Sequence, residues 1–329
     1  MTRLTQKRQL AGHDVGAIGL GCMSFGGMYG ATNEADSINC LTKAVEFGID
    51  HLDVAEVYGG GLCESVIGKF LRQTNADVKI ATKAGIYSTP TRSFKNDEAS
   101  LRASLEGSLK RLGRDHVELF YIHRREQTRP IEEVMLTLSK FIDEGLIGAI
   151  GLSEVAPSTL RRACAVHPVA AVQSEYSLWT RLPELGMIQA CGELGVTFVA
   201  FSPVGRGIFA DTFPNPTTFS DTDFRKQNPR FIEPNYSANT GVIAQFQQFC
   251  RARGWSTAAT ANAWALAQGD HILPIPGTRT AQNLADCAQA DQIIFTDADL
   301  AEIERLLPVG FAHGNRYAEA QLVGVEQYC

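Results

Sequence analysis

The chain has 329 residues, and its 30 lysines and arginines against 36 aspartates and glutamates give a formal net charge of −6. Hydrophobic residues make up 44% of the sequence, which excludes an intrinsically disordered chain. No run of about 18 apolar residues is present, so we expect no membrane-spanning helix, and the acidic balance with scattered charges argues against a dedicated nucleic-acid binder.

The N-terminal segment and the cysteines indicate a reducing compartment. Residues 1–8 are basic, but no apolar segment follows them, so we expect no secretory signal. The 8 cysteines are widely spaced and contain no C-x-x-C pair, which argues against a zinc site and against a disulfide framework. We therefore expect a cytoplasmic location and no bound metal.

Short β-rich runs alternate along the chain with stretches that have helical spacing. Most of these runs are continuously apolar, which is typical of parallel strands buried on both faces. The expected strands are residues 15–20, 49–54, 78–83, 117–123, 147–152, 169–174, 196–201 and 272–275.

Start and stop signals mark the helices between these strands. Asn33 or Asp36 can cap a first helix that ends at Gly48. Four leucines at helical spacing predict a helix that stops at Gly113. Three prolines can each open a further helix, namely Pro130, Pro157 and Pro183. The last two expected helices are the alanine-rich segment 257–267 and the segment 280–288.

The alternation predicts an α/β protein with the (β/α)₈ (TIM) barrel fold over residues 15–290, close to the usual length of about 250 residues. A doubly wound open sheet has the same alternation but usually fewer strands. No repeat or linker marks a second domain, so we expect one barrel domain over residues 1–329. We expect the polar, proline-containing segment 204–240 to be a lid loop over the C-terminal mouth, and 308–329 to be a tail.

Four reactive side chains follow the expected strands where a barrel carries its chemistry. Asp53, Lys83 and His123 end the second, third and fourth strands, and Tyr58 follows Asp53. The Asp53–Lys83 pair could be purely structural, His123 could be a core histidine, and Tyr58 alone could pack on the surface. Their convergence on one mouth favours catalysis instead. Lys83, held by Asp53, would lower the pKa of Tyr58 from about 10, and the site would suit proton delivery to a carbonyl oxygen.

Two glycine-containing segments could bind a nucleotide. Residues 19–24 resemble the start of a dinucleotide fingerprint, but Ser24 replaces the third glycine, so the signal is weak. Gly277-Thr278-Arg279 leads into a helix, whose first amides attract anions, and Arg279 could bind a phosphate there. Arg279 could equally be an ordinary exposed arginine.

Several segments resemble aldo-keto reductases, in that family's order. Residues 53–59 match its D-x-A-x-x-Y-G signature, and the similarity is greatest to the longer bacterial or potassium-channel-β-like branch. The other matching segments are 80–83, 121–124, 151–154, 172–178, 201–207 and 275–279. The resemblance implies a barrel that reduces aldehydes or ketones to alcohols with NADP(H), by hydride transfer from nicotinamide C4. Asp53, Tyr58, Lys83 and His123 would be the catalytic residues, with Tyr58 as the proton donor.

The same resemblance implies how the cofactor and substrate are held. Ser153 and Gln173 would hold the carboxamide, Phe201 would stack on the nicotinamide, and Arg279 would meet the 2′-phosphate. The full implied set of cofactor contacts is Gly21, Met23, Asp53, Ser153, Gln173, Phe201, Ser202, Pro203, Val204, Gly205, Arg206, Gly207, Pro276, Gly277, Thr278, Arg279 and Gln282. The implied substrate pocket, for a small carbonyl or alcohol, is Tyr58, His123, Ile86 and Trp179.

Two other functions fit the same expected barrel. Lys83 could form a Schiff base in an aldolase, although an adjacent Asp53 should raise the pKa of Lys83 and disfavour this. Alternatively, the chain could be a non-catalytic subunit that binds a nicotinamide cofactor and regulates a partner. The physiological substrate and the oligomeric state cannot be derived from these patterns.

Overall fold

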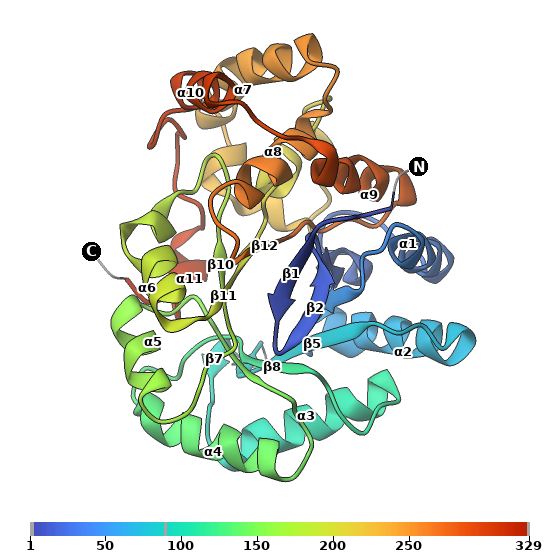
Figure 1. Cartoon of the computed structure of the whole chain (residues 1–329), viewed down its shortest axis with the longest axis vertical. Helices are drawn as coiled ribbons and strands as arrows, with labels where there is room; N and C mark the ends of the chain where they lie inside the picture. The colour runs from blue at the N-terminus through green and yellow to red at the C-terminus, as the bar shows by residue number, and fades with distance from the viewer. Residues whose placement is uncertain (1–2, 89–90, 328–329) are drawn as a thin grey trace.

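The computed structural model describes residues 3–88 and 91–327, and eight parallel strands form its central sheet. The sheet closes on itself because Gly21 forms a β-bridge with Gly277, while the Gly19 amide donates to the Pro274 carbonyl at 3.0 Å. The (β/α)₈ prediction is therefore confirmed (Figure 1). In spatial order the strands are β3 (Leu20–Gly21), β4 (His51–Asp53), β5 (Lys79–Ala84), β8 (Leu119–Ile122), β9 (Ile150–Ser153), β10 (Ala171–Glu175), β11 (Thr197–Phe201) and β12 (Ile272–Ile275).

The prediction of a first barrel strand over residues 15–20 is wrong. Val15 belongs to an antiparallel hairpin of β1 (Lys7–Leu10) and β2 (His13–Gly16), and the first barrel strand is the short β3. The hairpin lies across one end of the barrel (Figure 1). Leu10 and Val15 pack there against inward-facing side chains such as Leu119 and Leu273. Because these lie near the starts of their strands, the hairpin closes the N-terminal end and leaves the C-terminal end for a site.

Helices surround the barrel. The Asn33 side chain caps the first helix by accepting a hydrogen bond from the Asp36 amide, and Gly113 ends α3 in the left-handed region at φ 69°. The helices are α1 (Glu34–Glu46), α2 (Leu62–Thr74), α3 (Glu98–Leu112), α4 (Ile131–Asp143), α5 (Pro157–Cys164), α6 (Met187–Leu194), α7 (Asn235–Ala252), α8 (Thr257–Leu266), α9 (Ala281–Ala288), α10 (Asp297–Leu306) and α11 (Glu319–Leu322).

Three sequence predictions differ from these boundaries. Pro183 lies in the 3₁₀ turn η3 (Leu182–Leu185), and α6 begins only at Met187. The irregular loop after β11 ends at residue 234 instead of 240, because α7 starts at Asn235 with a polar first turn that has no helical apolar pattern. The tail 308–329 contains the single-turn α11.

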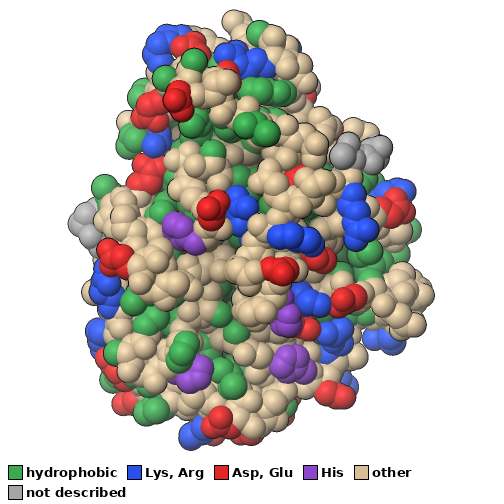
Figure 2. All heavy atoms as spheres, viewed as in Figure 1, with side chains coloured by type: hydrophobic (Ala, Val, Ile, Leu, Met, Phe, Trp, Pro, Cys, Tyr) green, Lys and Arg blue, Asp and Glu red, His purple; other side chains and the backbone are tan. Residues whose placement is uncertain are grey.

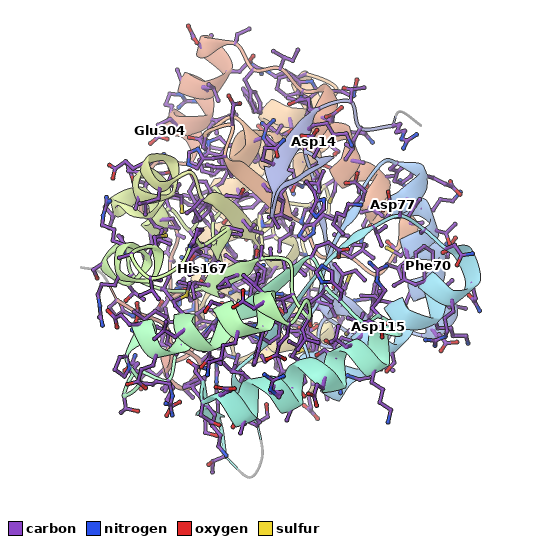
Figure 3. The ribbon with its side chains drawn as sticks, turned by 60° about the horizontal axis from the view of Figure 1, so that its bottom comes forward. Asp14, Phe70, Asp77, Asp115, His167 and Glu304 are labelled. Carbon is purple, nitrogen blue, oxygen red and sulfur yellow. The ribbon has the colours of Figure 1, made fainter. Side chains whose placement is uncertain are left out.

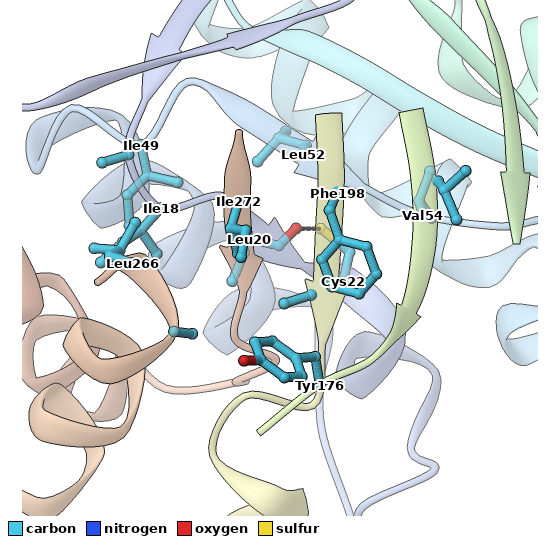
Figure 4. Close-up of a cluster of buried hydrophobic side chains, with 14 of the residues drawn as sticks. Ile18, Leu20, Cys22, Ile49, Leu52, Val54, Tyr176, Phe198, Leu266 and Ile272 are labelled. Carbon is cyan, nitrogen blue, oxygen red and sulfur yellow. Dashed lines mark hydrogen bonds between the residues drawn. The ribbon is translucent and has the colours of Figure 1, made fainter. Parts of the chain in front are cut away.

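A buried hydrophobic layer joins the barrel to its helices. Leu20, Leu52, Phe198 and Ile272 from four strands have no solvent exposure, and Leu266 of α8 packs with them (Figure 4). Burying such a side chain stabilises the fold by about 1.5–3 kcal/mol. This layer holds the strands in place, so the side chains at their C-terminal ends are held as well.

The hairpin end of the barrel carries mixed surface charges. Acidic and basic side chains are interspersed over the face that Figure 2 shows. Asp77, Asp115 and His167, labelled in Figure 3, lie in connections that lead from a helix into the next strand. Residues at this end of a barrel usually contribute to its stability and not to its chemistry. No helix among residues 3–88 and 91–327 has both the length and the apolar content to cross a bilayer.

Candidate active site

A cavity of ≈ 630 Å³ lies at the C-terminal ends of the barrel strands. Its lining comes from strand ends, from the loops after β3, β4, β5 and β11, and from the C-terminal tail. Most of the site residues expected from the sequence line it, namely Gly21, Met23, Asp53, Tyr58, Ile86, His123, Ser153, Gln173, Phe201, Ser202, Pro203, Val204, Arg206, Gly207, Gly277, Thr278 and Arg279.

Some expected residues do not line this cavity. Gly205 and Pro276 are chain neighbours of lining residues, whereas Gln282 is exposed on α9 and donates to Asp286 at 3.2 Å. The neighbouring Asn283, in the first turn of α9, lines the cavity instead of Gln282.

Trp179, expected in the substrate pocket, does not line this cavity. The ring packs at 5.8 Å between centroids against Phe209 and Phe231, and it lines a separate hollow of ≈ 480 Å³. Trp179 is 4% exposed, and the aromatic residues of the loop after β11 draw it into the core. This packing cannot be derived from the local sequence around Trp179.

A buried ion pair lies beneath the cavity. Asp53 ends β4, and Lys83 lies on the adjacent β5, so the barrel brings the two side chains together. Lys83 Nζ donates to Asp53 Oδ1, and also to the Val54 carbonyl at 2.8 Å. Gln173 Nε2 donates to the other oxygen, Asp53 Oδ2, at 2.7 Å. Lys83 is fully buried, so its ammonium contacts the floor of the site and not the open cavity.

Tyr58 and His123 lie above this pair. Their rings meet edge to face with centroids 5.6 Å apart, and Lys83 Nζ lies 5.2 Å from the centre of the Tyr58 ring. Tyr58 begins the turn η2 (Tyr58–Gly61), in which Gly59 and Gly60 both have φ 61°. Residues other than glycine rarely adopt that backbone conformation, so the two glycines allow the sharp turn that holds Tyr58 at the mouth. The structure thus brings the four expected catalytic side chains together.

The pKa of Tyr58 differs from the one expected from the sequence, and the pKa of His123 is shifted as well. Burial, reinforced by the Asp53 carboxylate, raises the pKa of Tyr58 well above its usual value, so the expectation of a lowered pKa is wrong. The reason is that Asp53 neutralises much of the Lys83 charge and burial disfavours a phenolate. Burial and the nearby Arg124 hold the pKa of His123 well below its usual value. Tyr58 is therefore a protonated phenol and His123 a neutral imidazole, and both can donate a hydrogen bond to a substrate oxygen.

The pKa of Lys83, which lies beneath these two rings, is also shifted. Burial lowers the pKa of Lys83, although Asp53 opposes this shift. The sequence prediction considered only the effect of Asp53 and missed the larger cost of burying a charge. The hydrogen bonds of Lys83 to Asp53 and to the Val54 carbonyl nevertheless hold its ammonium in one position.

The far end of the cavity provides backbone groups and a cation. Arg279 donates to the Tyr29 carbonyl, from the loop after β3. No carboxylate lies within 4 Å of the Arg279 guanidinium in the part of the chain that the structure describes. Thr280 caps α9 by accepting from the Asn283 amide, so the helix begins beside Arg279. A helix start next to an uncompensated arginine favours a bound phosphate.

Arg206 has a different role from the one expected. Arg206 lines the cavity, but its side chain is 1% exposed and donates to Glu175 at 2.7 and 3.2 Å. This bidentate pair fixes the start of the loop after β11. Both terminal nitrogens of the Arg206 guanidinium are therefore engaged by Glu175 within the protein.

Two loops and the tail enclose the cavity. The Phe224 amide donates to the Met28 carbonyl at 2.9 Å, so the loop after β11 meets the loop after β3. Tyr317 lines the cavity from the tail. The segment 204–240 was expected to cover the mouth, but its lining residues Phe224 and Arg225 could not be singled out because the loop has no periodic pattern. The other lining residues that were not expected as site residues include Ser88, Arg92, Arg124, Tyr317 and Gln321. Arg124 had the clearest signal, since it follows His123 directly.

Comparisons with known proteins agree with this geometry. The sequence model of the aldo/keto reductase family matches residues 17–308. An aldo-keto reductase of Schizosaccharomyces pombe, whose name includes NADP(+), is 37% identical over 318 residues, which cover 94% of each chain. A probable aldo-keto reductase of Glycine max is 38% identical over 312 residues, 93% of this chain and 89% of the relative. A solved glycerol dehydrogenase from Gluconobacter oxydans superposes with a TM-score of 0.84 at 25% identity, covering 92% of this chain and 94% of the other.

Proposed function

Because this chain belongs to the aldo/keto reductase family, we propose that it is an NADP(H)-dependent oxidoreductase that reduces an aldehyde or ketone to an alcohol. The observation that carries the proposal is the stack of Tyr58 and His123 over the buried Lys83–Asp53 pair at the C-terminal end of the barrel. The NADP(+) in the name of the Schizosaccharomyces pombe relative supports the choice of cofactor.

The lining of the cavity fits an extended dinucleotide. Ser153, Gln173 and Phe201 lie at the end near Tyr58, where they would hold and stack against a nicotinamide. Arg279, without a carboxylate partner among the described residues, lies at the other end, beside the start of α9, where it would bind a 2′-phosphate. When bound, NADPH supplies a hydride from C4 of the nicotinamide. The chain's own residues must therefore place the carbonyl and supply the proton.

Tyr58 is the proposed proton donor to the carbonyl oxygen. Its raised pKa keeps the phenol protonated, and His123 would orient the oxygen as a neutral hydrogen-bond donor. Loss of the proton leaves a phenolate, which burial disfavours. The Lys83 ammonium, 5.2 Å from the Tyr58 ring centre, would offset this cost, and Asp53 would hold the ammonium in place.

A Schiff-base aldolase is not favoured by the arrangement of Lys83. Its Nζ is fully buried, is committed to Asp53 and the Val54 carbonyl, and does not line the cavity. A substrate carbonyl could not reach it without displacing Tyr58 or opening the barrel floor. The alternative of a non-catalytic subunit differs from the reductase in one measurement, the turnover of NADPH.

The proposal is tested by the oxidation of NADPH with a panel of aldehydes and ketones. Replacing Tyr58→Phe removes the proposed acid and keeps the ring, so the turnover number should fall by about 10²–10⁴-fold. The dissociation constant of NADPH, measured by fluorescence quenching, should remain within about 2-fold of the wild-type value.

Tyr87→Phe is a matched control, because the Tyr87 hydroxyl lies outside the cavity and donates to the Ser100 carbonyl at 3.3 Å. It should retain wild-type turnover. A Tyr58→Phe enzyme with unchanged turnover would exclude Tyr58 as the acid. Wild-type protein that binds NADPH but oxidises it with none of the carbonyls would favour the non-catalytic alternative.

A further inference from the structure

Two arginines at the substrate end of the cavity have no direct contact with the carbonyl or the cofactor in the proposed reaction. Arg124 directly follows His123, at the end of β8, and is 6% exposed. Arg92 directly precedes β7 (Ser93–Phe94), lies 5.5 Å over the Phe94 ring and is exposed at the rim. Both line the cavity. Neither guanidinium has a carboxylate within 4 Å over residues 3–88 and 91–327.

Arg124 has uncommitted hydrogen-bond donors. Its Nη1 donates to the His123 carbonyl at 2.6 Å and to Ser153 Oγ at 3.0 Å, which fixes the side chain. Its Nε is buried and has no partner among the described residues. A buried donor without an acceptor is unfavourable. The Nε side of a guanidinium is one of the edges that bind a carboxylate or phosphate with two parallel hydrogen bonds.

The remaining charges around the cavity do not compensate these two arginines. Arg206 pairs with Glu175, and Arg225 pairs with Asp223 at 2.8 Å. The carboxylate in the cavity lining is that of Asp53, which already binds Lys83. The substrate end is therefore cationic beyond what the catalytic residues require.

Both arginines act on the reacting groups through space. Arg124 and Arg92 each contribute to the lowered pKa of His123, and Arg124 also opposes the raised pKa of Tyr58. Their positive field therefore reaches the place where the carbonyl oxygen would sit. A substrate that carries a negative charge would find complementary potential there, whereas a cationic substrate would be repelled.

We propose that this enzyme selects carbonyl substrates that carry an anionic group, a carboxylate or a phosphate, and that Arg124 and Arg92 bind this group. The inference rests on the proposed reductase function and specifies its substrate class. Arg124, which is held by Ser153 and the His123 backbone, would supply the fixed bidentate contact. Arg92 at the rim would supply a second, more exposed charge.

The test compares benzaldehydes that share the reacting carbonyl and carry a charged or a neutral group para to it. Rates of NADPH oxidation are measured with 4-carboxybenzaldehyde, with its neutral methyl ester, and with 4-formylphenyl phosphate. A charge-assisted contact predicts a kcat/KM about 10-fold or more higher for an anionic aldehyde than for the ester. The phosphate and carboxylate arms then identify the preferred anion. The advantage of the anions should also shrink as salt concentration rises, because exposed charges are screened.

Variants separate anion binding from folding. Arg92→Gln changes an exposed side chain and should lower kcat/KM for the preferred anion by about 5–10-fold, while the value for the ester changes less than about 2-fold. Arg124→Gln should cause a larger loss of the same kind. Arg251→Gln on α7 makes the same change of charge at an exposed position outside the cavity and should leave all the rates unchanged.

Three outcomes decide the proposal. Equal kcat/KM for the anionic and neutral aldehydes in the wild-type enzyme would overturn it and would leave the reductase function standing. Equal losses for all substrates in Arg92→Gln would also overturn it. If no aldehyde is reduced, the reductase function fails, but calorimetry that compares the binding of benzoate and benzamide still tests the anion site. Tighter binding of benzoate that is lost in Arg92→Gln supports the site. Equal binding of benzoate and benzamide refutes it.

Discussion

Arg279 lies at one end of the cavity between two segments, the loop after β3 and the start of α9. Its hydrogen bond to the Tyr29 carbonyl leaves other donors of the guanidinium available to a ligand. A 2′-phosphate is the chemical difference between NADPH and NADH. The residue that binds this phosphate should therefore decide between the two cofactors.

Replacing Arg279→Ala should weaken NADPH binding by about 10–100-fold, as expected for the loss of a charge-assisted contact. NADH binding should change by less than about 3-fold, because it has no phosphate at that position. Fluorescence titration of both cofactors measures the two dissociation constants. Arg305→Ala, exposed on α10, is the control, and equal losses for NADPH and NADH in Arg279→Ala would exclude the 2′-phosphate contact.

The sequence predicts which residues form the site better than it predicts their pKa values. Asp53, Lys83 and His123 end apolar runs, so the barrel alone determines that they converge. The pKa of the half-buried Tyr58 depends instead on desolvation and on groups that other segments bring near it, such as Arg124 and Tyr317. A prediction from neighbouring charges alone therefore had the wrong sign.

At the scale of elements, the hairpin of β1 and β2 has a structural role. Leu10 and Val15 are 2% and 0% exposed, and they fill the N-terminal end of the barrel. The Gln9 carbonyl also accepts from Thr197 Oγ1 at 2.7 Å, which joins the hairpin to the start of β11. The hairpin thus closes the end of the barrel opposite the cavity.

Leu10→Ala should lower the free energy of unfolding by about 2–4 kcal/mol, because it leaves a cavity in a packed region. KM for the carbonyl and the dissociation constant of NADPH should not change, since the site lies at the other end. Urea denaturation and steady-state kinetics measure the two effects. Leu136→Ala, at a position 57% exposed on α4, should cost less than about 0.5 kcal/mol. An equally small loss in Leu10→Ala would show that the hairpin does not support the barrel.

Elements with a regular pattern were predicted well, and those without one were not. The strands from β4 to β12 that form the barrel wall are short apolar runs, and α3 has leucines at helical spacing. The run at 15–20 failed because its apolar residues serve two different elements, β2 and β3. No helix was expected at α7, because its start, Asn-Tyr-Ser-Ala-Asn, is polar and lies inside the segment expected to be a loop.

At the scale of the whole molecule, the C-terminal tail completes a cavity that the barrel begins. Arg316 pairs with Glu154 and, at 3.4 Å, with Glu175, so the tail is joined to the ends of β9 and β10. Glu326 pairs with the buried Arg125 and accepts from the Ala156 amide at 2.7 Å. Between these two anchors the tail presents Gln321 to the cavity. Carbonyl binding should therefore depend on ion pairs that touch neither substrate nor cofactor.

Glu326→Gln tests this dependence, because it weakens the outer anchor and leaves Arg125 without its charged partner. We expect KM for the carbonyl to rise about 3–10-fold, as a loosened tail no longer holds the substrate end closed, while NADPH affinity stays within about 2-fold. Limited proteolysis should also cleave the tail faster. Glu319→Gln makes the same change of charge at an exposed tail position and should have neither effect. Faster cleavage with an unchanged KM would show that the Glu326–Arg125 pair orders the tail without shaping the substrate site. Unchanged cleavage would show that the Arg316 ion pairs are sufficient to hold the tail.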